Sequence, residues 1–102
     1  MRRVAITGIG IVSCIGNSTA EVSESLKNGK SGISRADKYV ELGFRSQIYG
    51  MPALDIEARV DKRVRRFMGE GAAWNYVAME QAIADAGLEE NDIINPMTGL
   101  IM

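Results

Sequence analysis

The feature of this 102-residue chain with the most chemical content is a basic run, in which five of the eight residues from 59 to 66 carry a positive charge. At about 100° per residue, a helix over this run has two distinct faces. One face carries the basic residues Arg59, Lys62, Arg63 and Arg66. The other carries the apolar residues Val60, Val64, Phe67 and Met68. The basic face could receive an acidic protein helix or phosphate groups, because arginine offers paired donors and clustered charge steers anions. The alternative interpretation is a solvated helix face without a partner.

Residue types that usually do catalysis are scarce. The chain has no histidine, and so lacks the commonest general base and the commonest metal ligand. Its single cysteine, Cys14, has no histidine to activate it, and we interpret it as structural rather than nucleophilic. A lone cysteine also excludes an internal disulfide, which fits a reducing compartment. The sequence therefore offers no Cys-His or Ser-His pair.

An apolar strand is predicted at the start of the chain, ending in a loop that carries Gly8, Gly10 and Gly16. A strand followed by G-x-G-x-x-G is the fingerprint of dinucleotide binding. Here Ser13 stands where the third glycine belongs, and the next helix start comes only at Ser18, so the register that aims amides at a pyrophosphate is lost. A degenerate nucleotide-binding domain stays an alternative. We favour a corner in which the glycines allow close backbone packing against a larger sheet.

Local signals predict a first helix and a second strand. The sequence Ser18-Thr-Ala-Glu21 has the form of a capping box, and Gly29 is suited to a left-handed C-terminal cap of the helix that follows. Residues 30–42 are mixed and rich in turn formers, whereas residues 44–49 alternate well enough for a short strand. A helix or turn from about Asp55 leads into the basic run.

A long helix is predicted from about residue 71 to residue 86. It stops at Gly87, and Leu88 is placed for the hydrophobic contact of a Schellman motif. Few of its residues suit water: Asn75, Glu80, Gln81, Ala84 and Asp85. A helix that is apolar nearly all round belongs inside a large protein. Residues 98–102 are typical of a buried strand that has barely begun, so we interpret the chain as the N-terminal fragment of a longer protein.

Composition excludes several classes of protein. With 46% hydrophobic and 25% charged residues, the chain is ordinary soluble globular material. It has neither an apolar run of membrane-spanning length nor a secretory signal, so we expect a cytoplasmic protein without a membrane partner. Twelve basic and thirteen acidic residues give a net charge of −1. Nucleic-acid binders usually show a domain-wide basic excess and stacking aromatic residues, and both are missing.

Five segments together resemble the start of the type I β-ketoacyl-[acyl-carrier-protein] synthases, members of the condensing-enzyme family. The segments follow the family order and are residues 3–17, 27–33, 44–50, 61–68 and 78–88. The resemblance implies an α/β, thiolase-like fold of five α/β/α/β/α layers, with residues 1–102 forming about its first quarter. It also implies a homodimeric acyltransferase of bacterial fatty-acid elongation. Such an enzyme condenses an acyl thioester with malonyl-acyl carrier protein and releases carbon dioxide.

The same resemblance assigns a binding role to four residues. Lys62, Arg63 and Arg66 match family positions that face the acidic helix of acyl carrier protein, and Arg45 is a further candidate beside them. The nucleophilic cysteine, two histidines and a lysine of the family come later in the chain. The resemblance therefore implies no catalytic residue, metal or cofactor between residues 1 and 102. A non-catalytic module that binds the carrier protein remains the alternative from another class.

Overall fold

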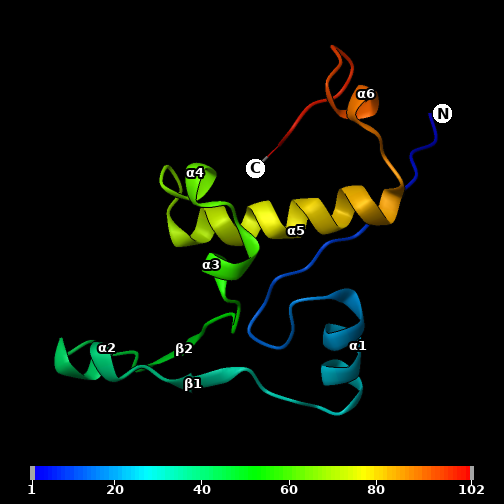
Figure 1. The fold of residues 1–102 in the computed structure, drawn as a ribbon. Coiled ribbons are helices and arrows are strands. Elements are labelled where there is room, and N and C mark those ends of the chain that lie inside the picture. The colour runs from blue at the N-terminus through cyan, green and yellow to red at the C-terminus, as the bar shows by residue number, and fades with distance from the viewer. Residues whose placement is uncertain (1, 102) are drawn as a thin grey trace.

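The computed structural model describes residues 2–101, which form six helices and one two-stranded sheet. In chain order these are α1 (Thr19–Lys27), β1 (Ile33–Arg35), α2 (Asp37–Glu41), β2 (Ile48–Gly50), α3 (Ile56–Arg59), α4 (Lys62–Arg65), α5 (Glu70–Ala86) and α6 (Glu90–Ile93). Helix α5 runs through the middle of the structure, with α3 and α4 beside its N-terminal half (Figure 1). The radius of gyration is 16.8 Å. A compact domain of this length has about 13 Å, so the elements form an open arrangement.

Helix α1 begins and ends where the sequence predicts. The Ser18 hydroxyl accepts a hydrogen bond from the Glu21 amide at 3.2 Å. The Glu21 carboxylate accepts one from the Asn17 amide at 2.7 Å, one residue before the cap. Gly29 has φ of 61°, a left-handed conformation that costs glycine little. The Ser18 cap and the glycine stop are confirmed, whereas the predicted capping box forms only in half, because Glu21 accepts from the Asn17 amide rather than the Ser18 amide.

The sheet has two short paired strands, where the sequence predicts one longer strand at residues 44–49. Strands β1 and β2 are antiparallel, with Ile33 opposite Gly50 and Arg35 opposite Ile48. Only the last two residues of the strand predicted at 44–49 belong to β2. The preceding residues turn away because α2 is inserted between the two strands, and the Tyr39 ring of α2 packs 6.1 Å from that of Tyr49. Residues 30–42, predicted as turns, contain both β1 and α2.

The predicted N-terminal strand is wrong for the residues that the structure describes. Residues 2–12 are extended but pair with no strand within 2–101. Instead the segment lies on α5, where the Ile9 amide donates to the Asp85 carboxylate at 2.9 Å and the Ile11 amide to Gln81 Oε1 at 3.1 Å. A strand is stabilised by its ladder partner. None is present here, and Val4 is 94% exposed.

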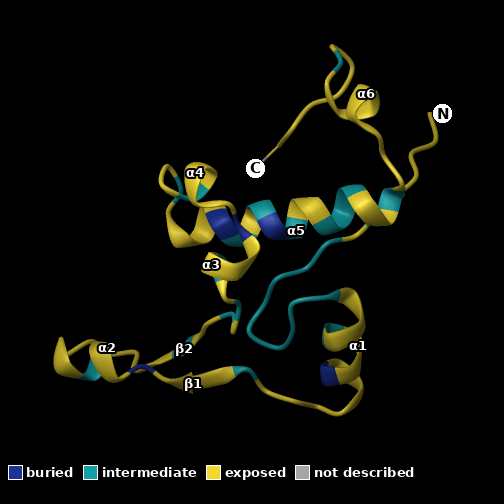
Figure 2. Cartoon of the chain, viewed as in Figure 1, coloured by how far each residue is buried: buried dark blue, intermediate teal, exposed yellow. Residues whose placement is uncertain are grey.

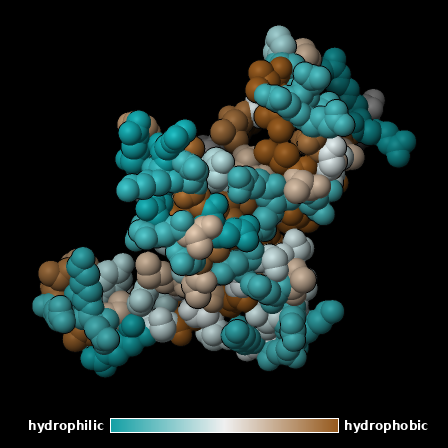
Figure 3. Space-filling model, viewed as in Figure 1, coloured by the Kyte–Doolittle hydropathy of each residue, from teal (hydrophilic) through white to brown (hydrophobic). Residues whose placement is uncertain are grey.

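The strand predicted at 98–102 is also not formed over residues 98–101, and Met102 lies outside the described residues. Ile101 is 97% exposed for the same reason, since no described strand pairs with it. Apolar side chains gather on the surface near α6 and the C-terminal end of α5 (Figure 3). The structure thus leaves both predicted strand segments uncovered.

Helix α5 confirms the predicted long helix to within one residue. Gly87 is left-handed with φ of 66°, its amide donates to the Ala84 carbonyl, and the Leu88 amide donates to the Ile83 carbonyl at 3.1 Å. These are the two hydrogen bonds of a Schellman motif. The fully buried residues of the helix, Ala73 and Val77, lie in its N-terminal half, and the C-terminal half is partly buried (Figure 2). That other parts of a larger protein cover helix α5 on several sides therefore stays a prediction. No helix within 2–101 is both long enough and apolar enough to cross a membrane.

Candidate functional site

The basic run forms two short helices rather than the single helix that the sequence predicts. Helix α3 ends at Arg59, Val60 is extended with φ of −118° and ψ of 126°, and α4 begins at Lys62. Two causes act at the break. Val60 is only 3% exposed, so its side chain is held in the core. The Asp61 carboxylate accepts a hydrogen bond from the Arg63 amide at 2.7 Å and so caps a new helix.

Helix α4 and its C-cap residue Arg66 carry three of the predicted site residues together. Lys62, Arg63 and Arg66 are all exposed. Helical spacing places them within an arc of about 100°, and we call these three residues the basic cluster. The ion pairs formed within residues 2–101 are Arg35–Asp37 and Arg65–Glu57, so the cluster has no acidic partner in the described part of the chain. Its positive charge is therefore directed to solvent.

The predicted apolar face is only partly buried. Val60 is the anchor, whereas Val64 is exposed and Phe67 is 79% exposed. The sequence places Phe67 on the apolar face, but its side chain is not buried within the described residues. Phe67 instead lies beneath the guanidinium of Arg66, whose Cζ atom is 4.5 Å from the ring centroid. This cation–π contact favours one placement of the Arg66 side chain.

Arg45 is not part of the basic cluster in this structure. It is exposed and lies in the segment between α2 and β2. Figure 1 shows that segment at the far end of the β1–β2 hairpin, away from α4. The sequence contained no indication that residue 45 lies apart from the cluster. Its position depends on the β1–β2 hairpin, which local patterns did not predict.

Arg65 differs from the other basic residues of the run. Its Nη1 atom lies 3.2 Å from Glu57 Oε1 of α3, and its side chain is 26% exposed. Sequence reasoning missed this pair. Helical spacing gave no sign of it, because residues eight apart in an unbroken helix are separated by about 12 Å along the axis, and this pair forms across the break at residue 60.

Cys14 occupies a packing position rather than a reactive one. Its Sγ atom is half-buried against two glycines beside the sheet. A Cβ at Gly32 would lie 2.8 Å from this sulfur, and one at Gly50 would lie 2.9 Å from it. Both distances are shorter than van der Waals contact allows, so the glycines provide the room that the thiol fills.

The glycine loop is used for packing as well. A Cβ at Gly8 would overlap the Ala82 carbonyl, and a Cβ at Gly10 would overlap the Ala78 carbonyl. The amides of Ile9 and Ile11 already donate to α5 side chains. A pyrophosphate needs free amides at the start of a helix. The structure therefore contradicts the nucleotide-binding alternative.

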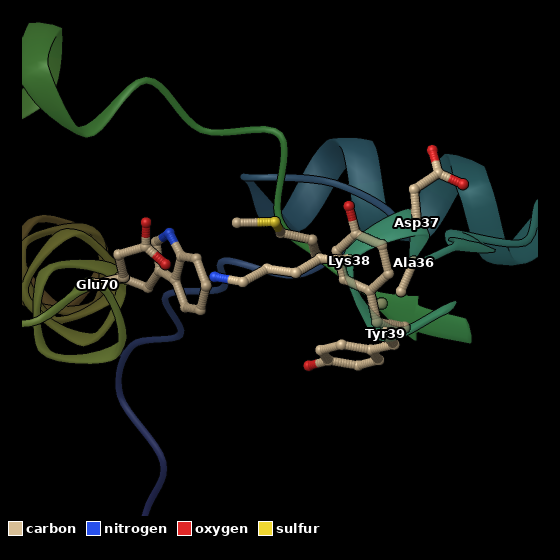
Figure 4. Close-up of a pocket in the computed structure, with 9 residues that line it drawn as sticks. Ala36, Asp37, Lys38, Tyr39 and Glu70 are labelled. Atoms are coloured by element: carbon tan, nitrogen blue, oxygen red, sulfur yellow. The ribbon is translucent and has the colours of Figure 1, made fainter. Parts of the chain in front are cut away.

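A cavity of about 520 Å³ lies between the β1–β2 hairpin and the start of α5. Figure 4 shows the Lys38 side chain extending across it toward Glu70. Its lining includes Tyr39, Tyr49 and Trp74 but no cysteine, serine or histidine. The cavity therefore contains no Ser-His or Cys-His pair.

Tyr76 lies on α5, and its phenol stays protonated at neutral pH. A hydrogen bond to Glu80 and the negative charge of that residue raise the pKa of Tyr76, and desolvation and the charge of Asp61 act in the same direction. A raised pKa favours the neutral phenol. Tyr76 is therefore no base at neutral pH.

Comparison with known proteins identifies the family. The family described as "Beta-ketoacyl synthase, N-terminal domain" matches residues 1–102. This chain belongs to the β-ketoacyl synthase family. The domain is 48% identical over 102 residues to 3-oxoacyl-[acyl-carrier-protein] synthase 1 of Haemophilus influenzae, covering 100% of this chain and 25% of that protein. It is 46% identical over 102 residues to the synthase 1 of Escherichia coli, covering 99% of this chain and 25% of the relative.

Similarity to a type II enzyme is lower. The β-ketoacyl synthase domain is 33% identical over 107 residues to 3-oxoacyl-[acyl-carrier-protein] synthase 2 of Coxiella burnetii, covering 97% of this chain and 24% of the relative. The predicted resemblance to the type I enzymes is confirmed. The chain spans about a quarter of the length of these relatives. Mixed helix and strand in a thiolase-like family agree with the predicted α/β class.

Proposed function

We propose that the whole protein is an acyltransferase that condenses an acyl thioester with malonyl-acyl carrier protein in bacterial fatty-acid elongation. The acyl chain is held on a cysteine outside this segment, and carbon dioxide is released from the malonyl group as the new carbon–carbon bond forms. Family membership and the names of the two synthase 1 relatives support this activity. The whole protein is a cytoplasmic homodimer in this proposal.

Residues 1–102 contribute scaffold and part of the docking face for the carrier protein. They form the N-terminal part of a five-layer thiolase-like fold, as their share of about 25% of the relatives suggests. The absence of histidine from the chain supports a segment without catalytic residues. In this assignment the basic cluster binds the carrier protein, and Arg45 makes a separate contact with it.

The observation that carries the docking role is the free positive charge of the basic cluster on α4. Lys62, Arg63 and Arg66 share one exposed face and have no acidic partner within residues 2–101. Isolated surface charges contribute little to folding. Clustered charges raise the association rate of an acidic partner and fix its register, and this effect weakens as salt screens it.

Charge reversal in the full-length protein tests the docking role. Lys62→Glu, Arg63→Glu and Arg66→Glu are each expected to raise the KM for carrier-linked malonyl substrate roughly three- to tenfold at low salt. A small malonyl thioester without the carrier is expected to react nearly as in the unchanged protein, since it gains no binding energy from the docking face. Lys27→Glu on α1 is a matched control, because it reverses an exposed charge outside the cluster.

Two results would contradict the docking role. One is an equal loss of activity on both substrates, which indicates a general structural defect. The other is an unchanged KM for the carrier-linked substrate in all three variants at low salt. Condensing activity that is absent even from the unchanged full-length protein would contradict the enzyme assignment and favour a non-catalytic carrier-binding module.

A further inference from the structure

We propose that the ion pair between Glu57 and Arg65 is a positioning device that fixes the direction in which α4 presents the basic cluster. The inference rests on the proposed docking function and adds two residues to it. Glu57 and Arg65 do not touch the carrier protein in this proposal. They act through Lys62, Arg63 and Arg66.

Helix α4 needs such a support because it is only four residues long. A single helical turn is not stable in water without contacts to the rest of the protein. Its own cap, the hydrogen bond from the Arg63 amide to Asp61, orders the start of the turn but does not fix its direction relative to α5. An extended residue, Val60, separates α4 from α3, so no continuous helix sets the angle between them.

The Glu57–Arg65 pair spans this break. Glu57 lies on α3, which packs against α5, and Arg65 is the last residue of α4. Arg65 Nη1 lies 3.2 Å from Glu57 Oε1, an ion pair without hydrogen-bond geometry in which the Glu57 side chain is 82% exposed. Both residues line a cavity of about 270 Å³, together with Glu70 and Ala73 at the start of α5. Buried Val60 holds one end of the connection, and the ion pair holds the other.

Glu57 could affect carrier binding through its negative charge or through its hold on α4. These two explanations predict opposite effects of removing its carboxylate. A carboxylate beside a basic cluster lowers the local positive potential. By charge alone, its removal should strengthen binding of an acidic carrier helix. If the carboxylate orients α4, its removal should weaken binding, because the three cationic side chains lose their common direction.

The test uses Glu57→Gln in the full-length protein. We expect the KM for carrier-linked malonyl substrate to rise roughly two- to fivefold, the range that an exposed ion pair supports. We expect kcat and KM for a small malonyl thioester to stay unchanged. Glu70→Gln is the matched control, since Glu70 lines the same cavity but forms no ion pair within residues 2–101. It should leave the KM for the carrier substrate unchanged or lower it slightly.

A charge swap gives a second, independent measurement. Glu57→Arg combined with Arg65→Glu keeps the net charge and restores an opposite-charge pair. We expect it to return the KM for the carrier substrate to within about twofold of the unchanged protein, while Arg65→Glu alone raises it. Arg65→Glu alone lowers the net charge by two and the swap restores it, so the swap is compared with Glu57→Arg alone. That variant raises the net charge by two and should still raise the KM for the carrier substrate if the pair orients α4; a lowered KM would contradict the positioning role.

The outcomes separate failure of the inference from failure of the docking function. If Arg63→Glu raises the KM for the carrier substrate but Glu57→Gln lowers it or leaves it unchanged, the positioning role is wrong and the docking role stands. If Arg63→Glu has no effect, the docking role is wrong, and the positioning role falls with it. Loss of activity on the small thioester in Glu57→Gln would also contradict the positioning role, because it indicates general unfolding.

Discussion

Gly10 lies directly on the backbone of Ala78, so that a Cβ at residue 10 would overlap the Ala78 carbonyl oxygen. Gly8 has the same relationship with Ala82, one helical turn further along α5. The spacings match because two residues of extended chain advance about 6.6 Å and four residues of helix about 6.0 Å. The segment therefore lies flat along α5, in the opposite direction to the helix.

Gly10→Ala is expected to destabilise the full-length protein, because the added methyl must push the segment away from α5. Overpacking of this kind costs about 1–3 kcal/mol, and we expect a lower midpoint in thermal or denaturant unfolding. Gly71→Ala is the matched control, since Gly71 is exposed and a Cβ there would meet no atom within 4 Å. Equal midpoints for the two variants would contradict the close packing described here.

Gln81 holds the same segment at two points. Its Oε1 accepts from the Ile11 amide at 3.1 Å, and its Nε2 donates to the Asn17 carbonyl at 2.7 Å. Gln81→Ala should lower the free energy of unfolding by about 1–3 kcal/mol, because two backbone groups lose partners. Gln81→Glu keeps the acceptor and loses the donor, so an intermediate loss is expected. An unfolding free energy of Gln81→Ala equal to that of the unchanged protein would show that the two bonds contribute nothing.

Cys14 and Gly50 are expected to be coupled. Gly50→Ala places a methyl 2.9 Å from the sulfur and should cost about 1–3 kcal/mol by overpacking. Combining it with Cys14→Ala removes the sulfur and should recover part of that loss. Measured unfolding free energies of the two single variants and the double variant give the coupling. Simple additivity would show that the two side chains do not meet.

Cys14→Ser should leave condensation intact, because the thiol is a packing group in our assignment. The measurement is the rate of condensation in the full-length protein, with unfolding measured in parallel. A fall in kcat of a hundredfold or more without loss of stability would instead mean that Cys14 takes part in the chemistry.

Sequence predicted best those features that depend on adjacent residues. Ser18, Gly29 and Gly87 mark helix ends that the structure confirms, because caps are satisfied within a few residues. Strands need partners, and the segments 3–12 and 98–101 have none among the described residues. Their apolar pattern was therefore not enough to form a sheet.

The candidate site shows the same division. Helical spacing correctly grouped Lys62, Arg63 and Arg66, since four residues span one turn. It failed at Asp61, whose side chain starts a new helix inside the basic run. It also gave no sign of the Glu57–Arg65 pair or of the separate position of Arg45. These depend on how α3, α4 and the hairpin are placed, which local patterns do not contain.

The isolated 102-residue chain is expected to be marginally stable and to associate. The side chains of Val4, Ile6 and Leu100 are 94%, 88% and 66% exposed. They lie on segments whose backbone groups have no strand partner within residues 2–101. Unpaired apolar edges of this kind are sites of aggregation. Figure 2 shows that buried positions are few and scattered over separate elements rather than gathered in one core.

Sedimentation velocity and circular dichroism of the isolated chain check this expectation. We expect species larger than a monomer and a broad thermal transition, because little apolar surface is buried cooperatively. Val4→Lys combined with Ile6→Lys is a matched variant that places charge on the uncovered segment, and it should reduce association. A monomer that melts in one sharp, cooperative transition would contradict the expectation and show that these residues form a self-sufficient domain.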